Sequence, residues 1–135
     1  MRIVLDTNIL LVSISSKSPF HWIFEAINSG TIQLCISNEI INEYAEIIER
    51  YFDKNVSELT IDAILNSPVT IFINQYYRWN LINQDPDDNK FVDCAIASNA
   101  ECIITNDNHF NILKNLNFPS VKIMTYSEFY IIFKK

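Results

Sequence analysis

Short apolar runs alternate along the chain with segments whose apolar residues recur at helical spacing. The apolar runs, which predict strands, fall near residues 2–5, 32–36, 69–73, 102–105 and 121–125. The segments with helical spacing fall near residues 20–29, 38–52, 57–66, 89–100, 108–116 and 126–133. Because strands and helices alternate, the pattern predicts an α/β fold with a mainly parallel sheet covered on both faces. Segment 74–84 fits neither pattern.

Two of the predicted helices carry an acid in an informative position. In segment 38–52 the apolar residues fill one arc, at about 100° per residue, and Glu43 lies close to the edge of that arc. In segment 89–100 apolar residues surround the helix, which indicates a buried helix, and Asp93 stands among them. A buried carboxylate without a partner is costly, so Asp93 is expected to face a metal ion, a network of donors or a solvent-filled cleft.

Length and composition indicate one domain that covers residues 1–135. The chain has 49% hydrophobic residues and a single glycine, and no stretch of it has the composition of a linker. It begins without a signal-peptide pattern, and no apolar run reaches membrane-spanning length, so we expect a cytoplasmic protein with no membrane partner. Three cysteines lie in apolar runs without metal-type spacing, which favours small core residues in a reducing compartment.

The charge balance limits how this chain could bind nucleic acid. Its formal net charge of −6 argues against a broad basic surface, because that binding mode needs clustered lysines and arginines. A nuclease is not excluded, since metal ions held by acidic side chains can meet the phosphate instead.

Two carboxylates are expected at one edge of the sheet. Asp6 follows the apolar run from Ile3 to Leu5, and Asp107 follows the run that begins at Cys102. Both therefore stand at the carboxyl end of a buried strand, where open α/β sheets bind their ligands. Because neighbouring carboxylates repel each other, such a pair persists when a divalent cation binds it or when some members hold protons. Oxygen ligands of this kind suit Mg²⁺ or Mn²⁺.

Four sets of fragments follow one another along nearly the whole chain: Leu5-Asp6-Thr7-Asn8, then Ser37 to Glu43, then Asp85-Pro86-Asp87-Asp88-Asn89-Lys90-Phe91 with Asp93-Cys94-Ala95-Ile96-Ala97, and finally Ile104-Thr105-Asn106-Asp107-Asn108-His109-Phe110. In this order and spacing they resemble the PIN-domain ribonucleases, and among them the toxin components of toxin–antitoxin pairs. The resemblance implies a three-layer α/β/α fold and hydrolysis of phosphodiester bonds in single-stranded RNA. It also implies a homodimer and inhibition by a cognate antitoxin protein.

The same resemblance implies roles for particular residues. The catalytic and metal-binding acids would be Asp6, Glu43, Asp93 and Asp107, with Asp88 as a further candidate ligand. Thr7, Asn8 and Asn106 would lie in supporting positions around them. The implied cofactor is Mg²⁺ or Mn²⁺, which would activate a water for attack on the scissile phosphorus, with either one or two ions present.

Each of these acids also has a plain structural interpretation. Asp6 and Asp107 could cap helices, Glu43 could be a solvated helix acid, and the Asp87-Asp88 pair could form a turn. Their joint occurrence at the ends of two strands and the edges of two helices favours the metal site. For His109, and for the aromatic residues of segment 74–84, packing is the simpler expectation.

Two other classes of function are compatible with a strand-end aspartate. One is phosphoryl transfer through an aspartyl phosphate on Asp6, although Asn8 stands where a second acid would be expected. The other is a catalytically inactive binding module of the same fold, against which the complete set of acids speaks.

Overall fold

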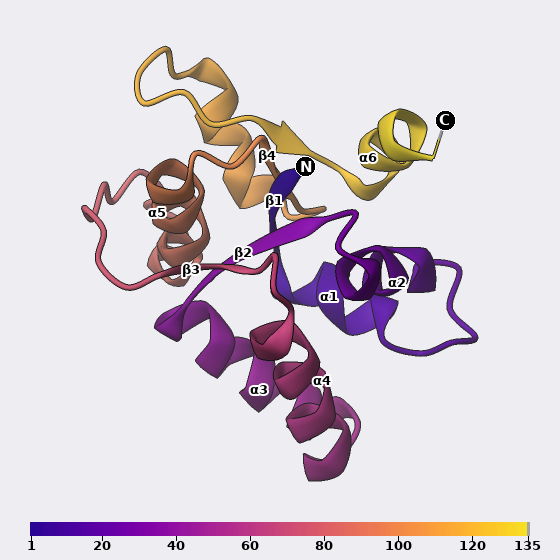
Figure 1. Cartoon of the computed structure of the whole chain (residues 1–135). Helices are drawn as coiled ribbons and strands as arrows, with labels where there is room; N and C mark the ends of the chain where they lie inside the picture. The colour runs from indigo at the N-terminus through magenta and orange to yellow at the C-terminus, as the bar shows by residue number, and fades with distance from the viewer. Residues whose placement is uncertain (135) are drawn as a thin grey trace.

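The computed structural model describes residues 1–134, and Lys135, the last residue of the predicted domain, lies outside them. Its centre is a five-stranded sheet in the order β3-β2-β1-β4-β5, with every neighbouring pair parallel. The strands are β1 (Arg2–Leu5), β2 (Gln33–Ser37), β3 (Ile71–Ile73), β4 (Cys102–Ile104) and β5 (Ile123–Met124). This arrangement confirms the predicted α/β fold with a parallel sheet (Figure 1).

Helices cover both faces of this sheet. The α-helices are α1 (Thr7–Ser13), α2 (His21–Ser29), α3 (Asn38–Tyr51), α4 (Lys54–Asn66), α5 (Asn89–Ser98) and α6 (Tyr126–Phe133), and the 3₁₀ helices are η1 (Pro86–Asp88) and η2 (Asn108–Asn115). From β1 to β3 the chain crosses the sheet in one direction, and from β3 to β5 in the other. Because parallel crossovers are right-handed, the two directions place their helices on opposite faces. Figure 1 shows α5 on one side of the sheet and α1 to α4 on the other.

The core explains why the segment of α5 is apolar nearly all round. Residues 89–95 of this helix are all buried, and α5 packs against β1, β2, β3 and β4. The strands beneath it are equally enclosed, with Ile3, Val4 and Leu5 of β1 fully buried. Since α5 runs antiparallel to the strands, its first turn lies at the carboxyl edge of the sheet.

Local signals fix where α3 begins. The hydroxyl of Ser37, the last residue of β2, accepts a hydrogen bond from the N–H of Ile40 (3.4 Å) and caps the helix. Ile40, Tyr44 and Ile48 then form the buried stripe of α3. Glu43 is therefore held in the second turn of the helix, close to the same edge of the sheet as the first turn of α5.

The structure differs from the sequence predictions in several elements. Helix α1 was not predicted, because Ile9 to Val12 continue the apolar character of β1 and hide the helical start at Thr7. Segment 74–84, which the pattern could not place, contains no helix or strand. The predicted helix at 108–116 is a 3₁₀ helix, and α4 begins at Lys54 rather than at residue 57. Among residues 1–134, no helix is both long and apolar enough to cross a membrane.

Candidate functional site

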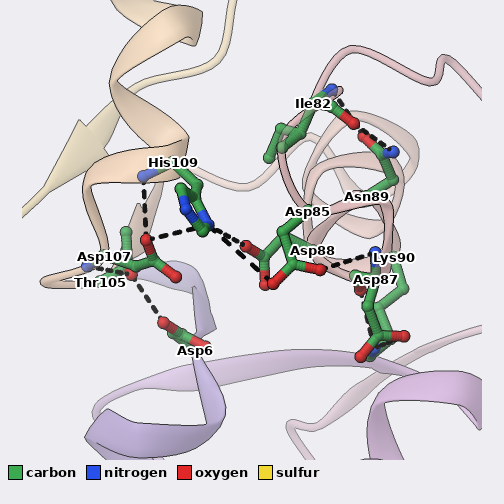
Figure 2. A network of polar contacts seen from close by, with 10 residues as sticks. All are labelled: Asp6, Ile82, Asp85, Asp87, Asp88, Asn89, Lys90, Thr105, Asp107 and His109. Carbon is green, nitrogen blue, oxygen red and sulfur yellow. Dashed lines mark hydrogen bonds and ion pairs between the residues drawn. The ribbon is translucent and has the colours of Figure 1, made fainter.

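Asp6 lies at the carboxyl end of β1 and is 7% exposed. Its Oδ2 accepts a hydrogen bond from the hydroxyl of Thr105, at 2.7 Å, directly after β4. The same hydroxyl oxygen accepts the backbone N–H of Asp107 at 3.0 Å. Thr105 therefore fixes the positions of Asp6 and Asp107 relative to each other (Figure 2). The structure brings these two predicted site residues together, as expected for the ends of adjacent parallel strands.

His109 occupies the space between Asp107 and the acids that precede α5. Its Nδ1 lies 3.4 Å from Asp107 Oδ1, 3.5 Å from Asp88 Oδ2 and 3.9 Å from Asp85 Oδ2. Figure 2 shows the imidazole ring directed between the two sides of this group. We call Asp6, Asp85, Asp88, Asp107 and His109 the open cluster. Ligand atoms of three members, Asp85, Asp88 and His109, all lie within 4.8 Å of one another.

Two buried side-chain atoms of the open cluster lack hydrogen-bond partners among the residues that the structure describes. Asp88 Oδ2 and His109 Nδ1 are buried, and neither makes a hydrogen bond within residues 1–134. Burial, followed by the charges of Asp85, Asp6 and Asp107, raises the pKa of Asp88 to about 7. Burial also raises the pKa of Asp6, although the hydrogen bond from Thr105 opposes that shift. The cluster therefore has the electrostatic character of a site for a cation.

Glu43 lies beside the open cluster and is paired with a lysine. Its Oε1 is 2.8 Å from the ammonium of Lys90, and its Oε2 accepts the hydroxyl of Thr7. Lys90 also lies 2.9 Å from Asp87 Oδ1 and donates to the Asp87 carbonyl oxygen at 2.7 Å. Burial by itself lowers the pKa of Lys90, but the hydrogen bonds that its ammonium donates to Glu43 and Asp87 outweigh burial and raise that pKa. We call Glu43, Asp87 and Lys90 the closed cluster.

Asp93 lies outside both clusters, contrary to its predicted place among the metal-binding acids. Its Oδ1 accepts the backbone N–H of Trp79 at 3.0 Å, and its charged neighbours are Arg78 and Glu39. The charged neighbours of Asp6 are instead Asp107 and Glu43. The sequence left three possible partners for the Asp93 carboxylate: a metal ion, hydrogen-bond donors or solvent. In the structure the carboxylate accepts a hydrogen bond from the backbone.

Helix geometry explains this displacement. Asp88 precedes α5 at the carboxyl edge of the sheet, whereas Asp93 is five residues further on, about 7 Å along the axis and about 140° around it. Asp93 therefore points to another side of α5 at a greater depth. Of these two acids, Asp88 is the one that lies near Asp107 and His109.

The three supporting residues have different surroundings. Thr7 contacts Glu43, as described, and Asn106 Oδ1 accepts the backbone N–H of Tyr126 at 3.1 Å. Asn8 and Asn106 line a cavity of about 330 Å³ that also opens onto two acids of the open cluster. Its walls are formed by Asp6, Asn8, Ile9, Val12, Phe20, Asn106 and Asp107.

Sequence reasoning did not assign Asp85, His109 or Lys90 to the site. Asp85 is held there by the loop before α5, where the side-chain amide of Asn89 bonds both the N–H and the carbonyl of Ile82 (2.8 and 3.0 Å). One local signal could have located His109, because Asp107 Oδ1 accepts its backbone N–H at 2.9 Å and turns it back toward the acids. The partner of Lys90 on α3 depends on tertiary packing, which no local pattern records.

Acids from different segments thus gather at the carboxyl edge of a parallel α/β sheet, which is the usual place for ligand binding in such folds. A family model described as "PIN domain" matches residues 2–109, and the chain belongs to the PIN-domain family. A chain in the crystal structure of VapBC2 from Rickettsia felis bound to a DNA fragment from their promoter has the same fold. It aligns with a TM-score of 0.63 and 18% sequence identity over 93% of this chain and 99% of that chain. None of the curated proteins compared with this sequence matches it.

Proposed function

We propose that this chain is a metal-dependent endoribonuclease that hydrolyses phosphodiester bonds of single-stranded RNA. The observation that carries the proposal is the open cluster, in which the buried Asp88 Oδ2 and His109 Nδ1 make no hydrogen bond within residues 1–134. Membership of the PIN-domain family supports the same conclusion, because the cluster lies within the matched residues.

The donor atoms of the open cluster fit a divalent ion. Carboxylate oxygens suit Mg²⁺ and Mn²⁺, and an imidazole nitrogen is compatible with transition metals. We propose Asp6, Asp88 and Asp107 as the main ligands, with Asp85 and His109 at the border of the site. An ion bound there would supply a Lewis acid that stabilises the negative charge on the phosphate during hydrolysis.

The protein groups around such an ion have defined tasks in this proposal. Thr105 holds Asp6 and Asp107 in fixed relative positions through its two hydrogen bonds of 2.7 and 3.0 Å. Asp88 has a pKa of about 7, which allows it to hold a proton when the site is empty and to release it when a cation binds. The cavity beside Asp6 provides apolar walls and the amides of Asn8 and Asn106, which suit a nucleotide next to the scissile phosphate.

The test is cleavage of a labelled single-stranded RNA by the purified chain in Mn²⁺, with and without a chelator. We expect cleavage that the chelator abolishes, and a loss of about a hundredfold or more in Asp107→Asn. Asp62→Asn, an exposed acid of α4, is the matched control and should cleave like the natural chain. Equal cleavage in chelator would refute the metal requirement. An acyl phosphate on Asp6, formed from a phosphate donor, would support phosphoryl transfer instead.

We further propose that the chain is the toxin of a toxin–antitoxin pair in the cytoplasm. The fold shared with a chain of the VapBC2 structure motivates this proposal. Exposed apolar residues on α4 and α6, among them Leu59, Leu65, Ile131 and Ile132, offer surfaces for a second copy or an antitoxin. We expect expression of the natural chain to arrest growth and Asp6→Asn to be harmless at equal abundance. If both arrest growth equally, toxicity does not come from the acids and the toxin role fails.

A further inference from the structure

Lys90 is a cation in a costly position. Its side chain is 7% exposed, and it is the second residue of α5, at the end of the helix where the backbone dipole disfavours positive charge. The surrounding oxygens compensate for both costs. They are Glu43 Oε1 at 2.8 Å, Asp87 Oδ1 at 2.9 Å and the Asp87 carbonyl at 2.7 Å. An ammonium has three protons to donate, so Lys90 is fully engaged by this one group of oxygens.

The contacts of Lys90 join helix α3 to the turn that precedes α5. Glu43 comes from α3, and Asp87 directly precedes Asp88 of the open cluster. The second oxygen of Glu43 accepts the hydroxyl of Thr7, which follows Asp6. Both oxygens of Glu43 therefore have protein partners, in contrast to Asp88 Oδ2, which has no hydrogen bond within residues 1–134.

The surroundings of Lys90 are strongly acidic. A cavity of about 300 Å³ opens beside it, lined by Glu39, Asn42, Glu43, Glu46, Asp87 and Lys90. Lys90 is the only cation among these lining residues, which include four acids. Without the ammonium, the partly buried Glu43 and the exposed Asp87 would face each other with the oxygen chemistry of a divalent-ion site.

We propose that the ammonium of Lys90 takes the place of a second divalent ion beside Glu43, so that the chain binds a single ion in the open cluster. This inference rests on the proposed metal-dependent function. Sites with two ions usually hold them about 3.5–4 Å apart, bridged by shared acids. Here the side of the site nearest Glu43 is closed by a fixed positive charge. Glu43 then acts as a positioning residue that holds Lys90 and Thr7.

The experiment counts bound Mn²⁺ by electron paramagnetic resonance of the free ion, with the full chain titrated without RNA. We expect about one tight ion per chain in the natural protein and in Lys90→Arg, and about two in Lys90→Gln. Lys17→Gln removes an exposed lysine and controls for the change in net charge, so it should bind one ion. Circular dichroism establishes that each variant is folded.

If Lys90→Gln alone does not fold, a double variant tests whether Glu43 is a metal ligand. Glu43→Gln with Lys90→Gln removes both charges of the pair together, and we expect it to bind one ion with an affinity within about threefold of the natural chain. A loss of tenfold or more, the usual range for a lost ligand or supporting group, would make Glu43 a ligand and overturn the inference. Two ions on the natural chain, or one unchanged ion on folded Lys90→Gln, would overturn it too. If the natural chain binds no Mn²⁺, the proposed metal site itself fails.

Discussion

The open and closed clusters lie side by side at one edge of the sheet, yet their charges are balanced in different ways. In the closed cluster, a buried ammonium lies within 2.9 Å of Glu43 and Asp87. In the open cluster, acids surround His109 at 3.4 to 3.9 Å, and Asp88 carries a pKa of about 7. An acid whose partners are already supplied by the protein, as Lys90 is for Glu43 and Asp87, contributes to structure. A buried acid without them indicates where an external cation is needed.

The largest expected effect is on hydrolysis, and it separates Asp88 from Asp93. Asp88→Asn removes a charge from the open cluster, so we expect RNA cleavage in Mn²⁺ to fall by about a hundredfold or more. Asp93→Asn retains an oxygen that can accept the Trp79 N–H, so it should cleave nearly as well as the natural chain. A loss in Asp93→Asn equal to that in Asp88→Asn, in a folded protein, would return Asp93 to the site.

Metal binding should also separate the two clusters in thermal unfolding. An ion that binds only the native state stabilises it by about 3 kcal/mol at a hundred times its dissociation constant, and more at higher concentration. We expect Mn²⁺ to raise the melting temperature of the natural chain, and Asp88→Asn to remove most of that rise. Asp87→Asn changes the neighbouring acid, which belongs to the closed cluster, and should keep the rise. Differential scanning fluorimetry across millimolar Mn²⁺ measures all three proteins, and a flat response in the natural chain would contradict a metal site.

The pKa of Asp88 predicts how stability depends on pH when metal is absent. It is about 7 in the folded chain, against an ordinary value of 3.8. Between these values the folded state binds more protons than the unfolded state, so the free energy of unfolding falls as the pH rises. From pH 5 to pH 8 we expect Asp88 to contribute a loss of about 2–3 kcal/mol.

Urea unfolding in chelator measures this dependence, with Asp88→Asn as the test and Asp62→Asn as the control. Asp88→Asn has no carboxyl at this position, so its stability should change less between the two pH values. Asp62→Asn should reproduce the natural slope. Identical slopes for all three proteins would mean that Asp88 is not the group that titrates.

Local sequence signals explain which parts of this molecule could be predicted. The run from Ile3 to Leu5 located β1, and with it Asp6 at the edge of the sheet. Ser37 and the buried stripe of α3 located the second turn, where Glu43 lies. Helix α1 could not be recognised by its pattern, because its apolar residues directly extend those of the strand.

Which acid of segment 85–93 lies in the site could not be predicted from the local sequence pattern. Periodicity correctly indicated that α5 is buried, but not which of its turns meets the edge of the sheet. That position is set by the loop of residues 74–85, which Asn89 fastens to the helix through Ile82. The same loop brings the Trp79 N–H to the buried carboxylate of Asp93. The helical pattern of the sequence cannot reveal this hydrogen bond.

The smallest expected effect concerns Thr105, whose hydroxyl connects two acids of the open cluster. Thr105→Val keeps the shape of the side chain but removes the donor to Asp6 and the acceptor for the Asp107 N–H. We expect a loss of about 1–3 kcal/mol in the free energy of unfolding and a loss of about tenfold in Mn²⁺ affinity. Thr70→Val is the matched control, because its hydroxyl donates to the Ile64 carbonyl at 2.7 Å, away from both clusters. It should lose stability while its Mn²⁺ affinity stays unchanged. If both variants bind Mn²⁺ equally well, Thr105 contributes only to folding, and the geometry of Asp6 and Asp107 does not depend on the hydrogen bonds between them.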